Sequence, residues 1–259
     1  MVEISTIRNR QGLSLSYVLN NGMTGAPVIV LVHGFAGSKD ENGLFKDAES
    51  YFSHHGFNTF RFDFSGCGGS SGDFIDATLR SHVDDLRTVL DHISKSHQGR
   101  PIVVLGFSLG ATVALLLNDP RVVAYALWSP ALSPAKDMYP RYATANIRTA
   151  IASQGFYPKA GLRLGAQMLA DLSRCSLERL APSLESPVLL VHGTGDSRIS
   201  WKTTTRFKNL FRSAETTIIN GADHSFKQKR QHRDVVLKQT AAWLKQIPAI
   251  SKCFGVGIR

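Results

Sequence analysis

Gly106-Phe107-Ser108-Leu109-Gly110 stands between two apolar segments of different character. Residues 101–105 are rich in β-branched side chains, as in a buried strand, and residues 111–117 favour a helix. A Gly-x-Ser-x-Gly at a strand-to-helix junction predicts a turn so sharp that a side chain at either glycine would collide with its surroundings. Such a turn raises the Ser108 hydroxyl clear of the sheet, which makes it a candidate nucleophile. The alternative is a glycine-rich turn without a chemical role.

Short apolar strands alternate with amphipathic helices along most of the chain. This alternation predicts an α/β fold with a mostly parallel sheet and helices on both faces. An opening hairpin is expected within residues 6–19, with its turn at Gln11-Gly12. Further strands are predicted at residues 28–32, 59–63, 101–105, 122–128, 188–191 and 216–219. Helices are predicted at residues 44–54, 79–94, 111–117, 202–210 and 235–247.

The alternation stops between Ser129 and Pro182, where five prolines occur and no clean strand is visible. A helix is expected there at residues 163–172. We interpret residues 130–182 as a short cap insertion over one end of the sheet, within a single domain that covers residues 1–259. The tail from Pro248 onward carries no pattern that predicts a structure or a role.

A serine nucleophile needs a base, and the base needs an acid that orients it. Three histidines follow Ser108 in the chain, and each has a different setting. His224 lies between a predicted strand and the last helix, in a loop that can reach the serine, and is the expected base. His192 ends a strand and suits a structural turn, whereas His232 stands among lysines and arginines and is expected in solvent.

The expected acid is Asp196, in the loop after the strand at residues 188–191. The strand before that one ends without a carboxylate. An aspartate at the start of a helix is also a common cap or turn residue, which is the alternative for Asp196. Asp223 is too close to His224 in sequence to be its easy partner.

Acyl transfer produces an oxyanion, which needs preorganised N–H donors. The loop His33-Gly34-Phe35 follows a buried strand, and the backbone N–H groups of Phe35 and Leu109 are the predicted oxyanion hole. His33 is expected to brace its loop. A second glycine-rich loop, residues 63–72, lacks the lysine of a phosphate-binding P-loop and is expected to fold back beside the site.

Charge and cysteine content favour neither nucleic-acid binding nor a metal site. The formal net charge is +10, but the basic residues are scattered, with the densest cluster at residues 227–233, and no nucleic-acid-binding motif accompanies them. Cys67, Cys175 and Cys253 form no pair that suggests zinc or a disulfide, so no metal and no cofactor is expected. Neither a signal peptide nor a membrane span is visible, which favours a cytoplasmic location. No feature of the sequence predicts an oligomeric state.

Taken in this order and spacing, the motifs resemble the α/β-hydrolases over nearly the whole chain. Within that superfamily the amino-acid sequence of residues 33–40 and 61–64 is similar to that of the cinnamoyl (feruloyl) esterases. The monoacylglycerol lipases and the serine aminopeptidases are the neighbouring families that the chain also resembles. The resemblance implies an eight-stranded sheet, a triad and a cap over the site. It also implies polar cap groups near a phenolic ring, for which the candidates are Asp137, Tyr139 and Tyr142.

The sequence therefore predicts a serine hydrolase of the carboxylesterase type, acting through an acyl-enzyme on small to medium esters, including aryl or cinnamoyl-type esters. Thioesters, amides or an acyl acceptor other than water are the nearest alternatives. A non-catalytic ligand-binding protein with this fold and a basic nucleic-acid binder are the alternatives of another class.

Overall fold

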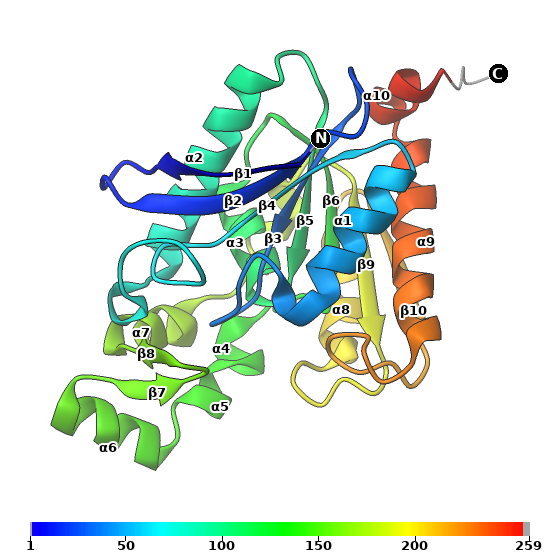
Figure 1. Ribbon diagram of the computed structural model, residues 1–259. Coiled ribbons are helices and arrows are strands. Elements are labelled where there is room, and N and C mark those ends of the chain that lie inside the picture. Colours follow the sequence, from blue (N-terminus) through cyan, green and yellow to red (C-terminus); the bar gives the residue numbers. More distant parts are fainter. Residues whose placement is uncertain (1, 256–259) are drawn as a thin grey trace.

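An eight-stranded sheet forms the centre of the computed structural model, which describes residues 2–255 (Figure 1). Its strands, in spatial order, are β1 (Val2–Arg8), β2 (Ser14–Asn20), β4 (Asn58–Phe62), β3 (Val28–Val32), β5 (Ile102–Phe107), β6 (Val122–Trp128), β9 (Val188–Gly193) and β10 (Ala214–Ile219). β2 pairs antiparallel with both β1 and β4, and the strands from β4 to β10 run parallel. The predicted α/β architecture with a mostly parallel sheet is confirmed.

Helices cover both faces of the sheet, and this explains the apolar runs in the sequence. Every residue of β3, β5 and β9 is buried, as expected for strands with a helix layer on each side. One face packs against α2 (Leu79–Ser96), α3 (Leu109–Leu117) and α8 (Trp201–Lys208). The other face packs against α1 (Leu44–His54) and α9 (Arg230–Gln246).

The β6–β9 segment, residues 129–187, contains α4 (Pro134–Asp137), α5 (Tyr139–Tyr142), α6 (Ala145–Gln154), β7 (Tyr157–Lys159), β8 (Leu162–Leu164), α7 (Ala166–Arg174) and η3 (Ala181–Ser183). The helices α4 to α7 and the hairpin of this segment lie across the end of the sheet where the parallel strands finish, at the bottom of Figure 1. The expectation of no strand here was wrong, because β7 and β8 form a hairpin. The expected helix at residues 163–172 starts three residues later, since Arg163 belongs to β8.

Two further differences concern the ends of the chain. β1 begins at Val2, earlier than the predicted hairpin, although nearly all of its residues are exposed. α9 begins at Arg230 and not at residue 235, and it buries His232, which we had expected in solvent. His232 and the buried Val236 are four residues apart and therefore share one face of the helix.

The remaining elements are short. The 3₁₀ helices are η1 (Glu41–Gly43), η2 (Phe74–Asp76) and η4 (Lys252–Phe254), and the tail also contains α10 (Pro248–Ser251). The last part of the tail, residues 256–259, lies outside the described residues. Within the described chain, no helix combines the length and the apolar character that crossing a membrane requires.

Candidate active site

Ser108 occupies the turn between β5 and α3 with a strained backbone. Its φ of 53° lies in the left-handed region, which residues with a side chain seldom adopt. The two glycines of the motif explain why the turn closes. A Cβ on Gly106 would stand 2.6 Å from the Cα of Ala111, and one on Gly110 would collide with the carbonyl oxygen of Val32. The collisions predicted from the sequence are present.

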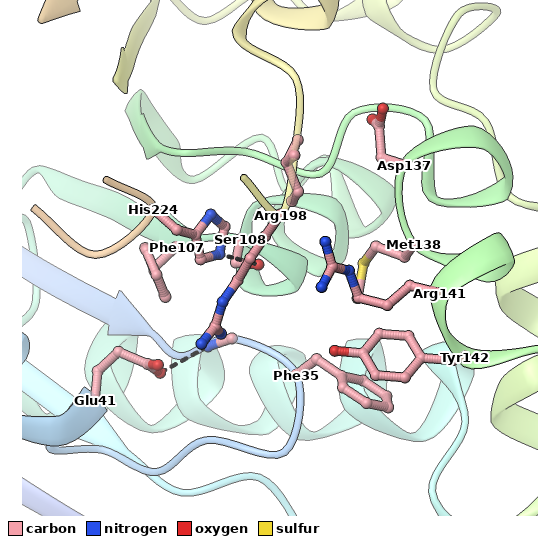
Figure 2. A pocket seen from close by; sticks show the side chains of 12 residues that line it. Phe35, Glu41, Phe107, Ser108, Asp137, Met138, Arg141, Tyr142, Arg198 and His224 are labelled. Atoms are coloured by element: carbon pink, nitrogen blue, oxygen red, sulfur yellow. Dashed lines mark hydrogen bonds between the residues drawn. The ribbon is translucent and has the colours of Figure 1, made fainter. Parts of the chain in front are cut away.

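The structure brings Ser108, His224 and Asp196 together from three loops. The Nε2 atom of His224 lies 3.1 Å from the Ser108 hydroxyl oxygen, and its Nδ1 lies 2.6 Å from Oδ2 of Asp196 (Figure 2 shows the first contact). All three side chains are buried or nearly so. The arrangement matches that of a nucleophile, a base and an orienting acid joined by hydrogen bonds in that order.

The loops that carry Asp196 and His224 are locked to each other through their backbones. The amide of Gly195 donates to the carbonyl of Ala222 at 3.0 Å, and the amide of Gly221 donates to the Thr194 hydroxyl at 2.7 Å. A Cβ on Gly193 would collide with the carbonyl of Ala222, so only glycine permits this close approach. The two loops therefore set the distance between acid and base.

The hydrogen bonds assign the protons. Burial raises the pKa of Asp196, but hydrogen bonds from His192, His224 and the Ile199 amide outweigh burial and hold that pKa well below its usual range. An ionised Asp196 only accepts, so Nδ1 of His224 carries the proton that it donates to Asp196. Nε2 of His224 is left to accept from the Ser108 hydroxyl, which is the tautomer a general base requires.

His192 supports the acid from behind, which is a more specific role than the structural turn expected for it. Its Nε2 lies 2.9 Å from the same Asp196 oxygen that binds His224, and its Nδ1 lies 2.6 Å from the hydroxyl of Thr204 in α8. The side chain has no solvent exposure. The acid is thus fixed by two imidazoles and by the backbone amides of Arg198 and Ile199.

The loop after β3 packs directly against the elbow. A Cβ on Gly34 would stand 3.2 Å from the Cβ of Ser108, and Phe35 lines the same pocket as Ser108. Neither Phe35 nor Leu109 has an acceptor for its backbone N–H among residues 2–255. The two predicted oxyanion donors therefore flank the serine with free N–H groups.

Glu41 holds this loop in place, and no motif in the sequence singles it out. Its Oε2 accepts from the Gly34 amide at 2.9 Å, and the carboxyl group also lines the pocket. Burial raises the pKa of Glu41 to about 7, although its bond to Gly34 and the charges of Lys227 and Arg198 act in the opposite direction. A carboxyl group that is only partly ionised at neutral pH therefore lies beside the predicted oxyanion hole.

His33 and the glycine-rich loop take the bracing roles expected of them. Nδ1 of His33 lies 2.9 Å from the Gly34 carbonyl, and its Nε2 accepts from the Phe64 amide at 3.1 Å. The buried Asp63 binds the Gly69 amide at 2.8 Å and forms an ion pair with Lys39. The residues 63–72 loop thereby folds back onto the loop of His33.

A small pocket opens beside Ser108 (Figure 2). Its cavity of about 40 Å³ is far smaller than a typical ligand pocket. The lining residues are Gly34, Phe35, Glu41, Phe107, Ser108, Asp137, Met138, Arg141, Tyr142, Arg198, Ile199 and His224.

Two of the three predicted substrate contacts line this pocket. Both oxygens of the Asp137 carboxylate have internal partners, the amide of Ser133 and the hydroxyl of Thr203, and burial raises its pKa. Tyr142 packs against Phe35 with ring centroids 4.6 Å apart. Tyr139 is not among the lining residues and packs on the hydrophobic core.

Arg141 and Arg198 also line the pocket, and the sequence analysis missed them. Arg198 stands two residues after Asp196, which is a usable signal, but arginines are numerous in this chain. Asp223, excluded as the acid, accepts from the amides of Lys227 and Gln228 and thereby shapes the His224 loop.

The chain matches one known family over more than half of its length. The family model described as Serine aminopeptidase, S33, matches residues 26–174, which is more than half of the chain. The chain belongs to this family. The match covers the loop of Phe35 and the elbow of Ser108 and ends before Asp196 and His224.

Curated relatives of this serine aminopeptidase family member include a lipase and a thioesterase. Monoglyceride lipase of Homo sapiens is 24% identical over 260 residues, which cover 86% of this chain and 84% of that protein. The mitochondrial palmitoyl-protein thioesterase ABHD10 of Bos taurus is 22% identical over 217 residues, which cover 79% of this chain and 69% of that protein.

Solved structures show the same fold. Est1E from Butyrivibrio proteoclasticus, solved with ferulic acid bound, has a TM-score of 0.77 at 20% identity and covers 93% of this chain and 98% of its own. The α/β-hydrolase domain-containing protein 10 from mouse has a TM-score of 0.75 at 18% identity, with 94% and 99% covered. The resemblance to the α/β-hydrolases is confirmed, and the chain is a member of a hydrolase family.

Proposed function

We propose that this α/β-hydrolase cleaves carboxylic esters through a covalent acyl-enzyme. The observation that carries the proposal is the continuous hydrogen-bonded chain from Ser108 through His224 to Asp196, at 3.1 and 2.6 Å. A base within such reach of a strained, raised serine is what nucleophilic catalysis requires.

In the first half of the reaction, the Ser108 oxygen attacks the ester carbonyl carbon and its proton passes to Nε2 of His224. Asp196 stabilises the imidazolium that forms. The N–H groups of Phe35 and Leu109 donate to the tetrahedral oxyanion. Collapse breaks the bond to the alcohol oxygen, which takes the proton from His224 and leaves. Water then attacks the acyl-enzyme with His224 as the base, and the carboxylic acid departs.

The proposed cap is the β6–β9 segment, with residues 130–182 at its centre. Its support is the pocket wall, where Asp137, Met138, Arg141 and Tyr142 line the same cavity as Ser108. The small pocket favours small to medium esters, and aryl or cinnamoyl-type esters stay in the proposal because of the likeness to an esterase solved with ferulic acid. A cytoplasmic location is retained as a prediction from the sequence.

Thioester hydrolysis with the same residues is the second candidate, and the names of the thioesterase relatives favour it. The same acyl-enzyme forms, and only the leaving group differs.

A fluorophosphonate probe followed by peptide mapping tests the nucleophile. We expect one adduct, on Ser108, and none on the Ser108→Ala variant. A panel of 4-nitrophenyl acetate, butyrate and decanoate, methyl ferulate and a palmitoyl thioester then ranks the acyl groups. A folded protein that neither labels at Ser108 nor turns over any of these compounds would contradict the proposal and favour a ligand-binding role.

A further inference from the structure

Two arginines from different parts of the chain line the pocket of the proposed catalytic serine. Arg141 belongs to α5 in the β6–β9 segment, and Arg198 belongs to the loop after β9. In Figure 2 the Arg141 side chain extends from α5 toward Ser108, while Arg198 descends in front of it, and both line the pocket. The fold therefore places two positive charges at one small cavity.

Among the described residues neither arginine forms an ion pair, although the charge of Arg198 acts to lower the pKa of Glu41. Nη2 of Arg141 donates to the carbonyl of Ser197 at 2.8 Å, which ties α5 to the loop of Arg198. Within residues 2–255, no carboxylate forms an ion pair with either guanidinium group. Several arginines elsewhere in the molecule do have such partners, among them Arg61, Arg121 and Arg233.

The two carboxyl groups of the pocket do not fill this role, because each is engaged elsewhere. Asp137 binds Ser133 and Thr203, and Glu41 binds the amide of Gly34. Burial also raises the pKa of Glu41 to about 7, so that much of this group is uncharged near neutral pH. The charge facing the cavity is therefore predominantly positive.

A guanidinium group offers five N–H donors in a fork that matches the oxygens of a carboxylate or a phosphate. Both arginine side chains are largely exposed, so they can change rotamer within nanoseconds and enlarge the 40 Å³ cavity when a substrate binds. An oxyanion group on the substrate would then lie between them, with the scissile carbonyl at Ser108.

We propose that Arg141 and Arg198 form an anion subsite, and that the preferred substrates are esters that carry a carboxylate or a phosphate group near the scissile bond. This inference rests on the ester hydrolysis proposed for Ser108. It narrows the substrate class from esters in general to anionic esters.

Matched substrates that differ only in charge test the subsite on the wild-type protein. For the alcohol side, 4-acetoxybenzoate and 4-acetoxyphenyl phosphate are compared with neutral methyl 4-acetoxybenzoate. For the acyl side, the mono-4-nitrophenyl ester of adipate is compared with its neutral methyl ester. We expect kcat/KM to be about 10- to 100-fold higher for the anionic member of at least one pair, the range of charge-assisted hydrogen bonds. The preferred compound tells a carboxylate from a phosphate and the alcohol side from the acyl side.

Arginine variants assign the preference to the two residues. In Arg141→Gln and Arg198→Gln, kcat/KM for the anionic ester should fall about tenfold more than kcat/KM for its neutral partner. Arg148→Gln is the matched control, since Arg148 is also exposed and also lies on the β6–β9 segment but does not line the pocket. It should leave both rates unchanged. Added KCl should lower only the anionic rate.

Equal rates on charged and neutral esters, or an equal loss on both in the arginine variants, would overturn the anion subsite. Turnover of neutral esters that depends on Ser108 would in that case still support the proposed function. Absence of any Ser108-dependent turnover would instead defeat the proposed function itself.

Discussion

The loops at the ends of β5, β9 and β10 hold Ser108, Asp196 and His224 far more tightly than the β6–β9 segment holds Arg141. Asp196 receives hydrogen bonds from two imidazoles and two backbone amides, and its loop contacts the His224 loop backbone to backbone. In the β6–β9 segment, α4 and α5 have four residues each, and Arg141 is exposed. We infer that the first region fixes the chemistry, whereas the second adjusts to the substrate.

The physical basis of this contrast is burial. A hydrogen bond between buried groups has no water to replace it, so its geometry is held closely. An exposed side chain on a short helix exchanges partners with water at little cost. The following variants test the contrast, beginning with the largest expected effect.

Ser108→Ala should lower kcat/KM for a 4-nitrophenyl ester by about 10⁴- to 10⁶-fold, because it removes the attacking oxygen. The folded structure should persist, as measured by circular dichroism. Ser153→Ala is the control from the β6–β9 segment, where the hydroxyl is exposed on α6, and it should retain full activity. Residual turnover within tenfold of wild type would remove Ser108 from the chemistry.

Glu41 lines the pocket together with residues of both regions, and its raised pKa makes stability depend on pH. Burial keeps the folded pKa near 7, above the ordinary 4.5, so between these values the folded chain keeps a proton that the unfolded chain has lost. The free energy of unfolding should therefore fall as pH rises from about 4.5 to 7, by up to about 3 kcal/mol from this group.

Glu41→Gln keeps an acceptor for the Gly34 amide but cannot ionise. Urea unfolding at pH 5 and pH 8 should show a smaller decrease in stability for this variant than for wild type. Groups elsewhere contribute equally to both proteins, so the difference in the decreases isolates Glu41. Identical decreases would show that Glu41 titrates at its ordinary pKa.

Gly193→Ala should separate the acid loop from the His224 loop, because the new methyl group collides with the carbonyl of Ala222. We expect a loss of about 1–3 kcal/mol in stability and about 100-fold in kcat, measured on the folded fraction. Gly155→Ala, on the β6–β9 segment, has open space around it but a φ of 85°. It should lose about 1–2 kcal/mol and no activity per folded molecule. If Gly193→Ala and Gly155→Ala had the same activity per folded molecule, the acid loop would not need to be rigid.

His192→Phe should cause the smallest change, a fall of about tenfold in kcat, because Asp196 loses one of its two imidazole donors. The loss of a donor should also raise the pKa of Asp196. In a pH–rate profile extended into the acid range, the limb that reports this group should then move to higher pH. Thr204→Val, which removes only the hydroxyl on the far side of His192, should keep both kcat and the profile close to wild type. If both variants behaved alike, His192 would serve packing alone.

The sequence predicted an element or a site residue where sterics or burial allowed only one kind of residue at a position. Gly106 and Gly110 are required by collisions with neighbouring backbone, so their pattern indicates the turn directly. The buried strands also stood out, because helices on both faces demand uninterrupted apolar residues. The positions of His224 and Asp196 followed from chain order along these strands.

Other elements have no signal of this kind. β1 is exposed along nearly its whole length and is held by pairing with β2, so no apolar alternation marks it. β7 and β8 have three residues each, too few to show a period. The first turn of α9 is charged, and that composition concealed both its start at Arg230 and the buried position of His232.

By itself, the sequence determined the order of the sheet-forming segments, the strained serine turn and the residue types available as base and acid, because these depend on local sterics and on burial. The tertiary structure decided which groups meet. It placed a second imidazole, that of His192, on Asp196, a buried Glu41 behind the loop of Phe35, and two arginines at the pocket. His192 and Asp196 are only four residues apart and Gly34 and Glu41 seven, but no local pattern in the sequence marks these contacts, and the packing of loops at one end of the sheet decides that they form.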